Sequence, residues 1–206
     1  MTPQRPTPAR PHTGDPIHTF THTLTSASRG RRALLVGALG SLALTLSGCA
    51  GPQLSDHAAE TPRFDLQTYF TGDLRAHGMV SDRGGRVIRR FVVDLRGEWN
   101  GDQGVLDEQF VYDDGERQRR VWRLRNLGDG RYSGQADDVV GEAFGEQSGA
   151  AFNWRYTLRL PVRGDVYDVQ FDDWIHLIDE NTALNRAVMS KWGVRVGEVT
   201  LSFTRK

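Results

Sequence analysis

Cysteine is almost absent from this 206-residue sequence, which contains one, Cys49. A single cysteine cannot form a disulfide within the chain, so a disulfide-stabilised scaffold is excluded. Histidine is also sparse, and His57, His77 and His176 do not have the spacing of a metal site. The sequence lacks a nucleophile elbow and a phosphate-binding loop as well. We therefore expect no metal and no cofactor. An enzyme is not the favoured interpretation, although nearby acidic residues leave His176 open as a general base.

Long apolar runs are missing too. The apolar run at residues 33–46 has 14 residues, fewer than the roughly 20 that a membrane-spanning helix needs. It follows an arginine-rich segment at 29–32 and ends in Leu46-Ser47-Gly48-Cys49. A positive segment, a short apolar segment and small residues are the parts of a secretory signal. The ending with two small residues and a cysteine resembles the lipobox of bacterial lipoproteins.

The lipobox resemblance implies that residues 29–48 are a signal peptide and that Cys49 carries a lipid anchor after cleavage. Two or more acyl chains hold a protein durably at a membrane, whereas one chain gives marginal binding. Ala50 follows the cysteine, which in Gram-negative sorting implies the outer membrane, with the protein facing the periplasm. The alternative is a membrane anchor with an incidental thiol.

The other segments divide the chain into a leader, a tether and one domain. Residues 1–28 contain five of the eight prolines and few large apolar side chains, which predicts a disordered leader or a misassigned start. Residues 30–35 weakly resemble a twin-arginine signal, so the export route stays open. Residues 49–66 are expected to be a flexible tether. Residues 67–206 suit a single domain.

An excess of positive charge is lacking as well. The whole chain has a formal net charge of +0, and removing the five arginines and one aspartate of residues 1–48 leaves 21 basic and 25 acidic residues, a net charge of −4. Proteins that bind nucleic acid usually carry a clustered basic face. We therefore expect no nucleic-acid partner.

From residue 69 onward, the sequence shows alternation of apolar and polar residues. Polar and glycine-containing turn clusters recur at 81–85, 100–102, 113–115, 128–130, 163–165 and 179–181. Between them, apolar residues such as Phe91, Val93 and Leu95 alternate with polar ones. This pattern predicts an all-β, up-and-down antiparallel barrel of about 8–10 strands, because closure removes exposed strand edges. Residues 182–191 fit either a short helix or a twisted strand.

Ionisable residues interrupt the apolar faces at a few positions. Glu108, Asp138 and Asp173 share their faces with apolar neighbours, which is costly unless they are paired. Arg120 is the nearest counter-charge in the pattern, and Asn185, Arg186 and Lys191 are further candidates. One interpretation is a polar group inside the barrel that binds a ligand headgroup. The alternative is a structural ion-pair network, or a bulge at Asp172-Asp173 that turns an acid outward.

Aromatic residues on the same strands either fill the core or line a ligand cavity. The predicted ligand-binding set combines them with the ionisable residues: Glu108, Arg120, Trp122, Asp138, Trp154, Tyr156, Asp173 and Trp174.

A set of short motifs carries a family resemblance: Tyr69-Phe70-x-Gly72, Leu106-x-Glu108-x-Phe110-x-Tyr112, Arg120-x-Trp122-x-Leu124 and Phe171-Asp172-Asp173-Trp174. Together they resemble the DUF3833 group of bacterial lipoproteins over Tyr69 to Lys206. The resemblance implies a lipocalin-like (calycin-type) barrel and a lipid anchor. From the family resemblance we also expect that the genes of relatives often neighbour genes for fatty-acid modification. Such a neighbourhood implies an acyl-chain or lipid ligand.

Three functional hypotheses follow from these observations. The first is a cell-envelope lipoprotein whose barrel binds a hydrophobic ligand, such as a fatty acid or lipid. The second is a structural or interaction lipoprotein with a closed core, acting on unknown protein partners through its arginine-rich outer faces. The third is an accessory enzyme that modifies lipids through His176 and Asp173. A cavity of at least ~300 Å³ lined by tryptophans and an acid would favour the first hypothesis.

Overall fold

The computed structural model describes residues 51–162 and 164–206. The predicted leader, the signal peptide and the lipidation site Cys49 lie outside the described residues. In the described part, no helix has the length and the apolar composition that crossing a bilayer requires.

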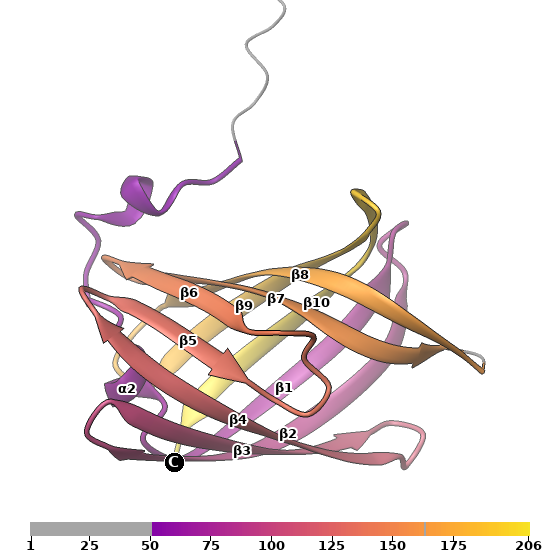
Figure 1. Cartoon of the computed structure of the whole chain (residues 1–206), viewed down its shortest axis with the longest axis horizontal. Coiled ribbons are helices and arrows are strands. Elements are labelled where there is room, and N and C mark those ends of the chain that lie inside the picture. The colour runs from indigo at the N-terminus through magenta and orange to yellow at the C-terminus, as the bar shows by residue number, and fades with distance from the viewer. Residues whose placement is uncertain (1–50, 163) are drawn as a thin grey trace, which may run out of the picture. The chain divides into compact units, whose positions relative to one another are not determined.

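The described residues form one closed antiparallel barrel in which each strand pairs with its neighbours in sequence (Figure 1). The strands are β1 (Gly72–Asp82), β2 (Val87–Asn100), β3 (Gln103–Tyr112), β4 (Arg117–Gly128), β5 (Arg131–Gln135), β6 (Ala143–Ser148), β7 (Ala151–Val162), β8 (Asp165–Leu177), β9 (Thr182–Lys191) and β10 (Val194–Arg205). Pairing of β1 with β10 closes the barrel. The predicted up-and-down barrel is confirmed, with ten strands within the described residues.

The segment that fitted either a helix or a strand is strand β9. It pairs with β8 on one side and with β10 on the other, so its backbone groups are satisfied by ladder hydrogen bonds. The helical turns lie elsewhere, in η2 (Leu54–His57) and α2 (Leu66–Tyr69). Asp65 caps α2, because its side chain accepts a hydrogen bond from the Thr68 amide at 2.8 Å.

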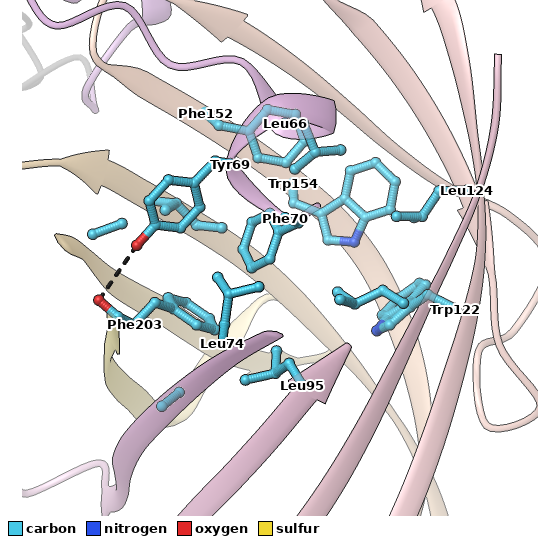
Figure 2. Packing of buried hydrophobic residues seen from close by; sticks show 14 of the residues in the cluster. Leu66, Tyr69, Phe70, Leu74, Leu95, Trp122, Leu124, Phe152, Trp154 and Phe203 are labelled. Carbon is cyan, nitrogen blue, oxygen red and sulfur yellow. Dashed lines mark hydrogen bonds between the residues drawn. The ribbon is translucent and has the colours of Figure 1, made fainter. Parts of the chain in front are cut away.

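Residues 64–70 close one end of the barrel. Phe64, Leu66, Tyr69 and Phe70 are all buried, although the predicted tether extended to residue 66. Phe64 stacks on Phe152 with ring centroids 5.7 Å apart, and Figure 2 shows the Tyr69 hydroxyl donating to the Phe203 carbonyl oxygen. Burial of a large apolar side chain contributes about 1.5–3 kcal/mol, which is why this segment folds onto the barrel.

A glycine on β2 leaves room for residues 64–70, which we call the closing segment. A Cβ atom built on Gly97 would lie 1.5 Å from the Phe70 carbonyl oxygen, so a side chain at this position of β2 would displace the segment.

Strand alternation sets the inside and the outside of the barrel. Phe91, Val93 and Leu95 are buried as predicted. The alternative of a bulge at Asp172-Asp173 is wrong, because β7 and β8 pair in continuous register there, with Arg155 opposite Asp172 and Trp154 opposite Asp173. Alternation alone therefore turns Asp173 inward and Asp172 outward.

Candidate functional site

The barrel encloses a cavity of about 1270 Å³. Its lining extends from Leu66 and Phe70 at the closed end to Lys191 and Trp192 at the opposite end, where the turns that follow β1, β3, β7 and β9 gather. Small-molecule sites usually have volumes of about 300–1,000 Å³. The interior is therefore large enough for a ligand of substantial size, and this end of the barrel is its opening.

Aromatic side chains form much of the wall. Trp122 packs edge-on against Trp154 with ring centroids 5.7 Å apart, and against Tyr156 at 5.4 Å. Tyr156 also stacks on Phe171 at 5.0 Å. Figure 2 shows Trp122 and Trp154 beside the closing segment. These contacts fix the positions of the rings, so they form a rigid apolar surface facing the cavity.

An ion-pair cluster lies in this aromatic wall. Arg120 on β4 binds Asp138 with two nitrogens, Nε at 3.0 Å and Nη2 at 2.7 Å. Its third nitrogen, Nη1, lies 3.7 Å from Glu108 Oε2 on β3. The side chains of Arg120 and Glu108 are each 13% exposed. Burial acts to lower the pKa of Arg120, but the bonds to Asp138 and the two negative charges outweigh it, so Arg120 stays charged.

Glu108 is the acid whose buried negative charge is least offset by neighbouring groups. Burial raises its pKa to about 7, Arg120 and the Trp122 side chain only partly offset the rise, and the charges of Asp138 and Asp173 add to it. Its Oε2 atom is buried without a hydrogen-bond partner among the described residues. Glu108 is therefore poised between its charged and neutral forms near neutral pH.

Asp138 enters the cavity from a turn and not from a strand. Strand β5 ends at Gln135, and the turn is attached to β7 by a bond from the Arg159 amide to the Asp138 carbonyl oxygen. Continued alternation would have turned Val140 inward, but Val140 is exposed and Val139 packs on the core. The structure thus brings Asp138 to Arg120 by a route that the sequence pattern did not predict.

A second polar group forms around Asp173 on β8. Its carboxylate accepts a hydrogen bond from the Tyr156 hydroxyl at 3.2 Å and another from the Asn185 amide nitrogen on β9. Burial raises the pKa of Asp173 to about 6, and these two donors lower it in part. Burial and the nearby Asp173 charge raise the pKa of Tyr156 well above its usual value, so the phenol remains a donor.

Seven of the eight predicted ligand-binding residues line the cavity, and Trp174 does not. It lies on the outer side of β8, where it stacks on His176 and contacts His57 near η2, with centroids 6.1 and 5.9 Å apart. Successive residues of a strand point to opposite faces. Asp173 and Trp174 therefore cannot both face the interior, and a covering segment buries Trp174 instead.

His176 also lies on this outer face. Burial and the neighbouring His57 lower its pKa. Arg186, another candidate counter-charge, points outward as well and pairs with Glu198 at 2.7 Å. Among the described residues, no group of three histidine, cysteine or acidic side chains could hold a metal ion.

Two cations line the open end of the cavity. Lys191 was one of the candidate counter-charges, whereas Arg89 was not predicted as a cavity residue. Arg89 lies 3.5 Å above the Tyr112 ring and pairs with Asp114 and Glu116. Lys191 lies 3.4 Å above the Tyr167 ring. Arg89 belongs to the arginine-rich strand surface that was expected to face solvent. Its odd position, shared with the inward-facing Phe91, was the signal that could have found it.

Several solved structures are similar to this barrel. The S-type phycobiliprotein lyase CPES from Guillardia theta gives a TM-score of 0.52 at 9% identity, covering 75% of this chain and 98% of that chain. A protein of unknown function from the DUF3598 family of Nostoc punctiforme gives 0.45 at 13% identity, covering 76% and 53%. Lobster apocrustacyanin A1 gives 0.39 at 15% identity, covering 77% and 72%. The similarity to the lyase shows the fold alone, a lipocalin-like barrel as predicted.

Sequence comparison agrees with the motifs. No curated protein matches the chain. The family model DUF3833, described as a protein of unknown function, matches residues 43–205. Since this match spans most of the sequence, the chain belongs to the DUF3833 family.

Proposed function

We propose that this protein is a lipid-anchored lipoprotein of the cell envelope whose barrel binds a hydrophobic ligand of the fatty acid or lipid class. The observation that carries the proposal is the cavity of about 1270 Å³, walled mainly by apolar and aromatic side chains and interrupted by a few ionisable groups. Sites for small apolar molecules combine a large apolar wall with a few polar groups that orient the ligand. An anchored barrel would keep such a ligand close to a membrane.

The cavity disfavours the hypothesis of a solidly packed structural barrel. The geometry also disfavours a lipid-modifying enzyme built on His176 and Asp173. Asp173 faces the cavity, whereas His176 packs against His57 and Trp174 on the outer side of β8. A general base must come within hydrogen-bond reach of the reacting group, and these two side chains lie on opposite faces of one strand.

Ligand binding is tested by filling the cavity. Ala187 on β9 is 2% exposed and lines the interior, whereas Leu184 on the same strand is exposed on the outside. We expect the full-length protein in lipid nanodiscs to bind an environment-sensitive apolar probe saturably. Ala187→Phe should weaken that binding at least ~10-fold and Leu184→Phe should leave it unchanged. Absence of saturable binding, or equal binding by Ala187→Phe, would contradict the proposal.

The proposed anchor is supported by the unpaired Cys49 after an apolar run, and the proposed outer-membrane location by Ala50. Cys49→Ser should move the protein from the membrane fraction to the soluble fraction or leave it unprocessed, and it should abolish incorporation of a labelled fatty acid. A Cys49→Ser variant that stays processed and membrane-bound would refute the anchor. Separation of inner and outer membranes tests the location.

A further inference from the structure

Around Arg120, the acidic side chains that line the cavity outnumber the basic ones, whereas Arg89 and Lys191 line its open end. Glu108, Asp138 and Asp173 line the cavity together with one guanidinium group in the same region, that of Arg120. Arg120 is already committed, because Nε and Nη2 both donate to Asp138 and Nη1 lies 3.7 Å from Glu108 Oε2. A carboxylate or phosphate placed in this part of the cavity would meet three acids and no uncommitted cation of the cluster.

Around Arg120 and Asp173, the buried atoms without a hydrogen-bond partner are acceptors, whereas the buried donor without a partner among the described residues, Arg89 Nε, lies at the open end. Glu108 Oε2 and Asn185 Oδ1 are buried and have no hydrogen-bond partner in the described part of the chain. The orientation of the Asn185 amide is fixed, since its nitrogen donates to the Trp174 carbonyl oxygen at 3.2 Å as well as to Asp173. Its oxygen must therefore face away from these groups. Asn185 is 3% exposed, so its oxygen depends on a donor within the cavity.

Water can donate to the Glu108 carboxylate while the cavity holds solvent, because this side chain lines the cavity and is 13% exposed. A ligand that displaces the water loses affinity unless it reproduces the hydrogen bonds. A buried acceptor without a donor is costly, and a buried charge more so. The bound molecule must therefore bring donors to this part of the cavity, and positive charge is favoured there.

We infer that the ligand's polar end is a cationic hydrogen-bond donor, an ammonium group on a long apolar chain, held by Glu108 and Asn185. This inference rests on the proposed function and narrows its ligand class from lipids in general to amines. An ammonium group has three donors, which suffices for both free acceptors. The Trp122 and Tyr156 rings beside the cluster add surfaces on which a cation binds favourably. The apolar chain then extends along Leu158, Val169 and Phe171 toward the open end.

The test compares dodecylamine, dodecanol and dodecanoate, which share one tail length and differ in their headgroups. Each displaces an apolar fluorescent probe from the full-length protein in nanodiscs at pH 8, with empty nanodiscs as the blank. We expect dodecylamine to bind at least ~10-fold more tightly than dodecanoate, with dodecanol between them. Glu108→Gln should reduce this preference to within ~3-fold. Asp107→Asn removes the same charge from the outer face of β3, where Asp107 pairs with Arg119, and should preserve the preference.

Dodecanoate binding as tight as dodecylamine would overturn the inference while leaving the proposed function intact. If that binding then weakened in Lys191→Gln, the headgroup would lie at the open end instead. Failure of the probe and of all three compounds to bind would overturn both the inference and the proposed function.

Discussion

Replacing Glu108 by glutamine is expected to stabilise the barrel at pH 8 and to leave its stability unchanged at pH 4. Burial raises the pKa of Glu108 from 4.5 to about 7 in the folded protein. The folded state therefore binds the proton more tightly than the unfolded state, and ionising Glu108 destabilises the fold. The cost is absent below pH 4.5, grows between pH 4.5 and 7, and is fully present above pH 7.

The size of the effect follows from the shift. One pKa unit corresponds to about 1.4 kcal/mol, so a rise from 4.5 to about 7 corresponds to roughly 3 kcal/mol. Glutamine has the shape of the neutral acid and removes this cost. With a urea dependence of about 1–3 kcal/mol/M, the unfolding midpoint at pH 8 should increase by about 1–3 M.

Urea unfolding monitored by tryptophan fluorescence at pH 4 and pH 8 measures the effect. Asp107→Asn is the matched control. Its pKa is lowered by the hydrogen bond from Arg119, so ionised Asp107 stabilises the fold above its unfolded pKa, and the amide should be slightly less stable at pH 8. An exposed pair of this kind contributes about 0–1 kcal/mol. If Glu108→Gln were destabilising at pH 8, or equally stabilising at both pH values, the assigned burial of an uncompensated acid would be wrong.

Two further predictions concern the cluster and the closed end. Arg120→Met should destabilise the protein by about 3–5 kcal/mol in urea unfolding, because it leaves buried acids unpaired. Adding Asp138→Asn should restore part of this stability. A loss of stability below ~1 kcal/mol in Arg120→Met would contradict the pairing. Gly97→Ala should lower the stability by about 1–3 kcal/mol or more, because its Cβ atom would collide with the Phe70 carbonyl oxygen. Gly51→Ala is the control and should leave the thermal midpoint unchanged, since there is open space around Gly51. Equal thermal midpoints for the wild type and both variants would refute the close approach.

The predicted effect of Glu108→Gln on stability is opposite to its predicted effect on amine binding. Natural proteins retain destabilising groups at functional sites, where the loss in stability supports activity. An acid that destabilises the empty barrel and strengthens binding of a cation fits this pattern. Measuring both quantities in one variant therefore separates a binding group from an accidental buried acid.

Local alternation was enough to predict the barrel, because a period of two and glycine-containing turns constrain each hairpin independently. It also placed Glu108, Arg120 and Asp173 inside. Whether the interior is hollow depends on the summed volume of side chains from all the strands, and no single strand carries that information. The cavity therefore emerged only from the assembled structure.

Strand alternation failed as a guide to side-chain position where a segment outside the strands covers or carries the residue. Trp174 is buried on the outside because residues near η2 cover it, and an alternation pattern does not distinguish such a covered face from the interior. Asp138 does line the cavity, but it lies beyond the end of β5, where the period of two that was used to place it no longer applies. The closing segment at 64–70 was assigned in part to a tether, since its short helix carries no periodic signal.

The closed end is also the end at which the chain enters the barrel, since residues 64–70 lead directly into β1. The mouth, bordered by Lys191 and Trp192, lies at the opposite end of the barrel. A molecule that enters the cavity through this mouth does not have to displace the buried residues that close the other end.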